Sequence, residues 1–86
     1  MNTEERDAFF DEVVRAVASG DMTWGAAVRT LRTDVAGVNQ ATFSKMTKVS
    51  ERTLRQLETD AGNPTLATLE AVLKPFGLNV GLRRRR

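Results

Sequence analysis

The chain has 86 residues, of which 41% are hydrophobic and 28% are charged, and its net charge is +2, which suits one small domain. It contains no cysteine and no histidine, so disulfides, thiolate or zinc-finger sites and histidine-based acid–base catalysis are excluded. No apolar run approaches the roughly 20 residues of a transmembrane helix, and acids stand where an export signal has bases. We therefore expect a cytoplasmic protein without a membrane partner.

Charge is unevenly distributed along the chain. Residues 1–21 carry two basic and six acidic side chains, a net charge of −4, whereas 22–59 and 60–86 each carry a net charge of +3. The net positive charge of residues 22–86 indicates a partner with negative charge. For the terminal run Arg83 to Arg86 three interpretations stay open: contacts with phosphates, contacts with an acidic partner, or a mobile tail.

The first predicted helix covers about residues 3–19. Asn2 or Thr3 caps it, Asn2 and Glu5 have the spacing of a capping box, and Gly20 ends it. Its apolar stripe consists of Phe9, Phe10, Val13, Val14 and Val17. The stripe predicts packing on the core or on a dimer partner.

The second predicted helix has Thr23 as its N-cap and stops at Gly37. One face carries the apolar residues Trp24, Val28, Leu31 and Val35. At this helical spacing, Trp24 is expected in the core and not as a platform for a ligand.

Two short helices follow, at about residues 40–47 and 51–60, with Asn39 and Ser50 at their N-cap positions. The first is anchored by Phe43 and Met46, and the second by Leu54 and Leu57. Because the other residues of 51–60 are polar, we expect most of that helix to face outward.

The last predicted elements are a helix and a strand. After a loop at residues 60–64, Thr65 or Pro64 begins a helix that places Leu66, Leu69, Val72 and Leu73 inward and ends at Pro75 and Gly77. Residues 78–82 alternate with period two, which predicts a short β-strand. Because a lone strand leaves its backbone groups unpaired, the same strand of a second subunit is its simplest partner. The expected class is all-α, with five helices and one C-terminal β-strand that pairs across a dimer.

The spacing within the two short helices is the most informative pattern. Counted from Gln40, the apolar residues at positions four, ten, fifteen and eighteen are Phe43, Val49, Leu54 and Leu57. Small Ser44, at position five, stands where two helices cross. This spacing lets the second helix protrude, and a helix about 10–12 Å wide fits the major groove of B-DNA.

Three segments resemble the phage-repressor-like (Xre) helix-turn-helix family: Gly37–Gln40, Val49–Glu58 and Asn63–Leu66. The resemblance covers about residues 24–77 and implies a lambda-repressor-like five-helix domain that binds double-stranded DNA as a homodimer. Residues 65–82 are similar to HipB-type antitoxins, in which a C-terminal strand pairs across the dimer and the partner is a HipA-like kinase toxin. The implied organisation is a helical extension (1–22), a DNA-binding domain (23–77), and a strand with an arginine tail (78–86).

The chain departs from the family pattern at three places. Lys48 replaces the usual turn glycine, Thr47 replaces an apolar residue, and the second helix is one residue longer before Gly37. The acidic first helix is an addition.

The resemblance also implies the contacts with DNA. Ser50, Glu51, Arg52 and Gln56 match the positions that reach base edges, where Arg52 pairs with guanine, Gln56 with adenine, and Glu51 accepts from cytosine. Gln40 matches a residue that touches the DNA backbone and braces the recognition helix, and the other backbone candidates are Asn39, Thr42, Lys45 and Arg55. Glu58 matches a position that pairs with an arginine of an earlier helix, here Arg32.

These side chains also have simpler interpretations. Glu51 suits the first turn of any exposed helix because the helix dipole favours an acid there. The basic candidates Lys45, Lys48, Arg52 and Arg55 are also typical of a solvated surface.

We expect a sequence-specific, dimeric repressor of a palindromic operator, and the HipB similarity implies that it is also an antitoxin. The alternative is a protein-interaction adaptor that retains the fold but not DNA binding. No catalytic group of residues, phosphate-binding loop or metal constellation appears, so we expect neither an enzyme nor a cofactor.

Overall fold

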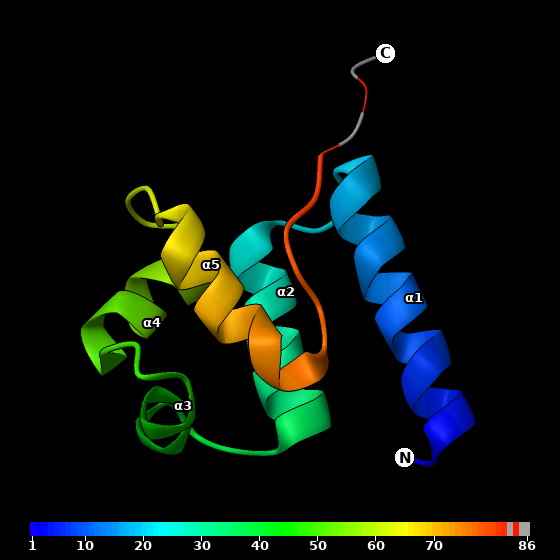
Figure 1. Cartoon of the computed structure of the whole chain (residues 1–86), viewed down its shortest axis with the longest axis horizontal. Helices are drawn as coiled ribbons and strands as arrows, with labels where there is room; N and C mark the ends of the chain where they lie inside the picture. Colours follow the sequence, from blue (N-terminus) through cyan, green and yellow to red (C-terminus); the bar gives the residue numbers. More distant parts are fainter. Residues whose placement is uncertain (83, 85–86) are drawn as a thin grey trace.

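The computed structural model describes residues 1–82 and Arg84, and these residues form five α-helices. The helices are α1 (Thr3–Ser19), α2 (Trp24–Thr30), α3 (Gln40–Thr47), α4 (Glu51–Glu58) and α5 (Leu66–Leu73). A π-helix (Leu31–Ala36) continues α2, and a 3-10 turn (Lys74–Phe76) follows α5. In Figure 1, α3 and α4 form one end of the molecule, α1 forms the other, and α2 and α5 lie between them. The predicted tail residues Arg83, Arg85 and Arg86 lie outside the described residues.

A polar side chain caps the start of every α-helix. In each case the side-chain oxygen of the cap accepts a hydrogen bond from the backbone N–H three residues later, and the caps are Asn2, Thr23, Asn39, Ser50 and Thr65. The capping box of Asn2 and Glu5 is present as predicted. Each cap contributes about 0.5–2 kcal/mol relative to alanine, so local chemistry determines where the helices begin.

The predicted core is largely confirmed. Its fully buried side chains are Val28, Leu31, Phe43, Leu54 and Val72. Helix α1 adds Val13 and Ala16, and Phe10 contacts Phe76 edge to face with 6.4 Å between ring centroids.

Four apolar residues that were predicted to pack inward are exposed, and one of them is Val14 of α1, which keeps 51% of its surface exposed. Trp24 keeps 40% of its surface exposed because the chain does not fill the space between the start of α2 and α1. Met46 is turned outward because Thr47, four residues after Phe43, occupies the inward position of α3. Leu66 is exposed at the first turn of α5.

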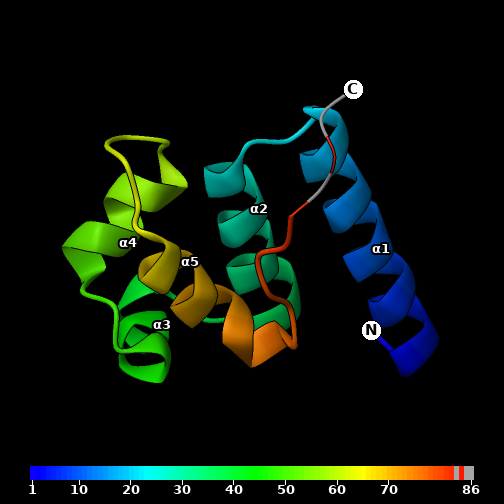
Figure 2. The same ribbon diagram turned by 45° about the horizontal axis from the view of Figure 1, so that its top comes forward.

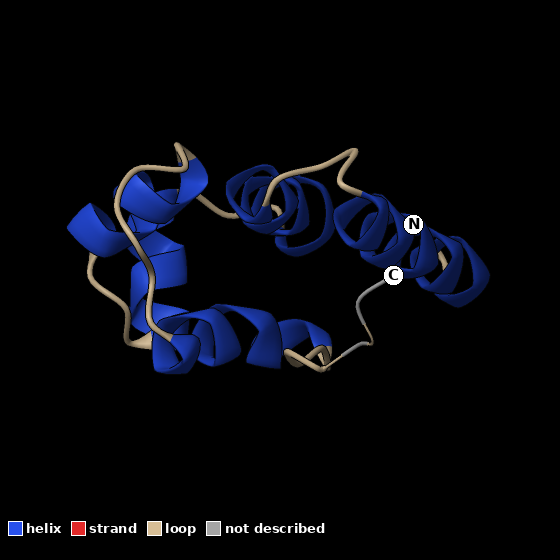
Figure 3. Cartoon of the chain, turned by 90° about the horizontal axis from the view of Figure 1, so that it is seen from above, coloured by secondary structure: helices blue, strands red, loops and turns tan. Residues whose placement is uncertain are grey.

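The predicted β-strand is not present in the described part of the chain. Residues 78–82 run without regular secondary structure, and Figure 3 shows only helices and loops. The physical reason is that the chain offers this segment no second strand. Instead, the N–H of Leu78 donates to the carbonyl oxygen of Leu73, and the N–H of Val80 donates to the Glu70 carboxylate at 3.0 Å.

The additional residue before Gly37 is accommodated by the π-helix. A π-helix closes its hydrogen bonds over five residues instead of four, so its turn holds one more residue than an α-helical turn. Leu31 and Arg32 thereby both remain buried. Gly37, at φ 65°, then ends the helix in the left-handed conformation.

Helix α4 ends at Glu58, two residues before the predicted end. Asp60 has a left-handed φ of 58°, and its carboxylate accepts hydrogen bonds from the Thr23 hydroxyl at 2.8 Å and the Gly25 N–H at 3.0 Å. These bonds hold the residues just after α4 against the start of α2.

Lys48 also has a left-handed backbone, with φ 60°. We expect Lys48→Gly to raise the free energy of unfolding by about 0.5–1 kcal/mol, because relief of the left-handed strain of ~1–2 kcal/mol exceeds the entropy cost of glycine. Urea denaturation measures the change. Asp60→Gly is the matched control: it relieves similar strain but removes the two hydrogen bonds of the carboxylate, so it should destabilise the protein. Equal effects of both substitutions would contradict this account.

Candidate nucleic-acid interface

Helix α4 has one buried side and one exposed polar side. Leu54 and Leu57 are buried, as predicted, and Glu58 is buried beside them. The exposed side chains are Glu51, Arg52, Arg55 and Gln56. Figure 2 shows α4 at the edge of the molecule, on the side away from α1, so its polar side is open to a large partner.

The turn between α3 and α4 is fixed by its own polar groups. The Thr47 hydroxyl donates to the carbonyl oxygen of Phe43 at 2.8 Å and accepts from the N–H of Val49 at 3.3 Å. Thr47 is therefore buried without an unsatisfied hydroxyl, although the family pattern has an apolar residue there. With Lys48 left-handed and Ser50 capping α4, the turn sets the angle between the two helices.

A buried ion pair ties α4 to the π-helix and to α3. Arg32 Nε and Nη2 donate to the two Glu58 carboxylate oxygens at 2.7 and 2.8 Å, as the predicted pairing requires. Arg32 Nη1 also donates to the carbonyl oxygen of Val38 at 2.9 Å, and Gln40 Nε2 donates to Glu58 Oε1 at 3.2 Å. Gln40 therefore does brace α4 from the first turn of α3.

The Glu58 carboxyl has a pKa below its ordinary value of 4.5. Burial raises this pKa, but the hydrogen bonds from Arg32 and Gln40 and the positive charges of Arg32 and Arg29 lower it more. The carboxylate therefore stays charged and keeps its partners at neutral pH.

The nine residues predicted to contact DNA come from α3, α4 and their caps. Gln40 is half-buried and the other eight are exposed: Asn39, Thr42, Lys45, Ser50, Glu51, Arg52, Arg55 and Gln56. Two of them also serve as caps. Asn39 Oδ1 accepts from the N–H of Thr42 at 2.8 Å, and Ser50 Oγ accepts from the N–H of Thr53 at 3.1 Å.

The surface beside α4 includes polar residues that were not predicted to contact DNA. A shallow cavity of about 240 Å³ between α4 and the start of α5 is lined by Gln56 together with Thr53, Asn63, Thr65 and Thr68. The Thr65 hydroxyl donates to Thr68 Oγ1 at 3.0 Å. The sequence signal that could have found these residues is the Pro64-Thr65 cap, which indicates an exposed polar helix start. The structure places this helix start next to Gln56.

Comparison with known protein families identifies the family to which residues 28–82 belong. A family described as Helix-turn-helix matches residues 28–82. The match includes α3, α4 and α5 and leaves α1 outside. Comparisons with curated proteins and with solved structures give no match. Within the described residues, no helix has the length and apolar character needed to cross a membrane.

Proposed function

The chain belongs to the phage-repressor-like (Xre) helix-turn-helix family of DNA-binding regulators, and we propose from this premise that it is a homodimeric repressor of a palindromic operator. The observation that carries the proposal is α4 itself, a helix anchored by Leu54 and Leu57 whose other side is polar and exposed. Such a helix enters the major groove and places its first two turns against the base edges.

Two side chains of α4 are proposed to determine the operator sequence. Arg52 is suited to a bidentate pair with guanine, and Gln56 is suited to one with adenine. Both are exposed, and no hydrogen bond within the described residues occupies either side chain. Ser50 and Glu51 at the start of α4 are proposed as further base contacts.

The start of α3 is proposed to position the protein on the DNA backbone. Its free N–H groups and the exposed side chains of Asn39, Thr42 and Lys45 suit phosphates, as does Arg55 of α4. Gln40, the half-buried first residue of α3, is proposed to contact the backbone as well while it holds Glu58.

In the proposed dimer two copies of α4 contact successive major grooves, with half-sites about 34 Å apart or a multiple of this spacing.

The similarity to HipB-type antitoxins suggests a second role, the binding of a kinase toxin. The acidic helix α1, which lies outside the family match, supplies an exposed surface for such a partner. Copurification with the product of the adjacent gene tests this role, and an adjacent product that neither binds nor arrests growth would reject it.

We expect Arg52→Ala and Gln56→Ala each to weaken operator binding by about 10- to 100-fold, because a bidentate base contact discriminates by ~1–3 kcal/mol. The operator is first selected from random duplexes, and affinities for it and for an unrelated duplex are then measured at two salt concentrations. Binding to the unrelated duplex should change little for Gln56→Ala, which removes no charge.

Arg6→Ala is the matched control, since Arg6 is an exposed arginine of α1 at the other end of the molecule. It should leave operator affinity nearly unchanged. If wild-type protein does not prefer any duplex, or if neither α4 substitution reduces its preference, the repressor proposal fails and the adaptor function becomes the better account.

A further inference from the structure

A cavity of about 410 Å³ lies between the start of α2 and the loop that follows α4. Its wall contains one carboxylate, that of Asp60, and the described residues that line it include no lysine or arginine. Most of the remaining wall is apolar or aromatic and is formed by Met22, Trp24, Leu57, Ala61 and Pro64. A largely apolar cavity of this size with one charged group is typical of a site for a small organic molecule.

The Asp60 carboxylate retains the capacity to bind a charged donor. It forms no ion pair within residues 1–82 and Arg84. Its oxygens each accept one hydrogen bond, Oδ2 from the Thr23 hydroxyl at 2.8 Å and Oδ1 from the Gly25 N–H at 3.0 Å. Because each carboxylate oxygen has two lone pairs, each can accept one more hydrogen bond. A cation can therefore pair with Asp60 without displacing either partner.

The backbone conformation of Asp60 supports a functional role for this residue. Its left-handed φ of 58° is less favourable for a residue with a Cβ atom than for glycine. Strained positions of this kind cluster at ligand sites, where the surrounding structure holds them in place. Here the hydrogen bonds from Thr23 and Gly25 hold the carboxylate at the wall of the cavity.

We propose that this cavity binds a small organic cation, an amine whose ammonium group pairs with Asp60 and whose apolar body lies against Met22, Trp24 and Leu57. The ammonium group donates to the open lone pairs of the carboxylate, and such a charge-assisted hydrogen bond is stronger than a neutral one. Trp24 favours the same ligand, since the face of an indole ring attracts positive charge. A neutral molecule of the same shape gains only the apolar contacts.

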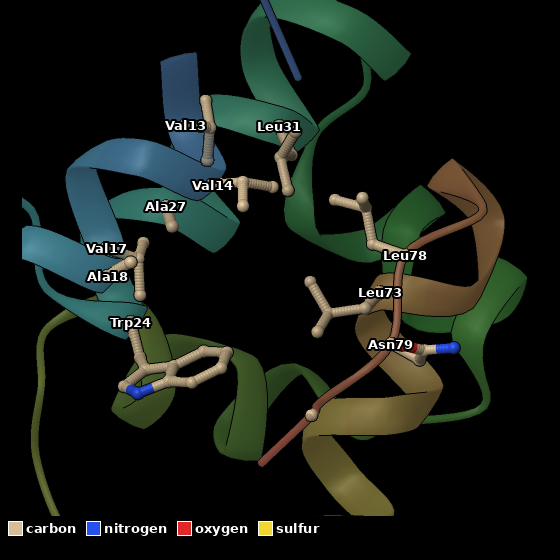
Figure 4. A pocket seen from close by; sticks show the side chains of 11 residues that line it. Val13, Val14, Val17, Ala18, Trp24, Ala27, Leu31, Leu73, Leu78 and Asn79 are labelled. Carbon is tan, nitrogen blue, oxygen red and sulfur yellow. The ribbon is translucent and has the colours of Figure 1, made fainter. Parts of the chain in front are cut away.

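A second cavity also includes Trp24 and supplies a comparison for the test. The groove in Figure 4, of about 340 Å³, lies between α1, α2 and residues 78–81. Of the described residues that line this groove, none is acidic or basic. An apolar molecule that enters the groove therefore forms no ion pair there, whereas an amine that enters the cavity at Asp60 does.

The test compares 2-phenylethylamine, which is positively charged at neutral pH, with 2-phenylethanol, a neutral molecule of nearly the same shape. Binding to the full chain is followed by calorimetry and by the emission of Trp24, the sole tryptophan. We expect the amine to bind with a dissociation constant of about 1 mM or below, a value within reach of a small ligand. The alcohol should bind about 10-fold more weakly, because it lacks the charge-assisted hydrogen bond.

Asp60→Asn should weaken binding of the amine about 10-fold and leave binding of the alcohol unchanged. Asparagine removes the charge, tolerates a left-handed φ and keeps an oxygen that accepts from the Gly25 N–H. Asp11→Asn is the matched control, since it makes the same change of charge at an exposed acid of α1 that lines neither cavity. It should leave both affinities unchanged, and circular dichroism should show both variants folded.

Three results overturn the proposal: no saturable binding of the amine, equal affinity of the wild-type protein for amine and alcohol, or an equal effect of Asp60→Asn and Asp11→Asn. Equal affinity for the two molecules assigns their binding to apolar contacts alone, as in the groove of Figure 4. The wild-type comparison decides the matter even where Asp60→Asn loses stability. None of these measurements involves DNA, so their outcome is independent of the proposed regulatory function.

Discussion

Glu58→Ala should lower the free energy of unfolding by about 3–5 kcal/mol, because it leaves the buried Arg32 guanidinium without its carboxylate. The side chains of Arg32 and Glu58 are only 10% and 3% exposed, so water cannot replace the lost partner. A chain of this size has only a few kcal/mol of net stability, and the substitution should therefore leave much of it unfolded at 25 °C. Urea denaturation at neutral pH, followed by circular dichroism, measures the effect.

The matched control is Glu12→Ala on α1. Glu12 and Arg15 form a contact of the same length, 2.7 Å, but their side chains are 63% and 57% exposed. Exposed pairs of this kind contribute little because solvent screens them and both side chains lose freedom. A loss for Glu12→Ala as large as that for Glu58→Ala would show that burial does not control the strength of these pairs.

The same ion pair should make stability depend on pH. The folded-state pKa of Glu58 lies below the value of 4.5 that the unfolded chain has, so the unfolded state binds a proton first as pH falls. The contribution of Glu58 is therefore fully present above pH 4.5 and is lost as pH falls through the lower, folded-state pKa. Urea midpoints measured from neutral pH to about pH 3 should fall over this range.

Glu58→Gln removes the charge while retaining an oxygen that accepts from Arg32. This variant should be less stable than wild type at neutral pH, and the difference should shrink as the pH falls below 4.5. A constant difference across the whole range would exclude Glu58 as the titrating group. Any acid sensitivity that remains in the variant comes from other carboxylates. One of them is Glu12, whose pKa is lowered by the hydrogen bond from Arg15 and by the positive charge of Arg15.

The beginnings of the helices were predictable because a cap is a local interaction. Asn39 bonds to Thr42 and Ser50 to Thr53, three residues apart, and no distant element is needed for either. The inward positions of Leu54 and Leu57 were predictable for a similar reason, since they are the apolar residues of an otherwise polar helix. The exposed polar side of α4 follows from the same pattern.

Features that depend on packing between elements far apart in the sequence were not predictable from periodicity. Trp24 lies on the apolar face of its helix, yet its burial depends on how closely α1 approaches, and α1 leaves a groove. Residues 78–82 alternate with the period of a β-strand, but a strand forms only when a second strand pairs with it. The pairing of Arg32 with Glu58, 26 residues apart, followed from the family resemblance and not from residue spacing. The π-helix likewise changes only the hydrogen-bond register, which composition does not reveal.

The close approach of α2 to α4 leads to a result opposite to the usual rule for helices. Gly25 lies within α2, where alanine is normally favoured by about 1 kcal/mol. A Cβ atom at this position would collide with the carbonyl oxygen of Leu57 and would lie 2.6 Å from Asp60 Oδ1. Gly25→Ala should therefore destabilise the protein by about 2–4 kcal/mol, through overpacking and the loss of the hydrogen bonds that Asp60 accepts.

Two comparisons separate this collision from other effects of removing a glycine. Gly20→Ala has no atom within 4 Å of the added Cβ and meets only the strain of φ 85°, so it should cost about 1–2 kcal/mol.

The double variant Gly25→Ala with Asp60→Ala removes one collision partner but keeps the Leu57 carbonyl. It should be more stable than the sum of the single effects predicts, yet less stable than Asp60→Ala alone. Because Leu57 belongs to α4, Gly25→Ala should also weaken binding to the proposed operator, although Gly25 lies outside the proposed contact surface. If Gly25→Ala were as stable as wild type, the close packing that holds α4 in place would be disproved.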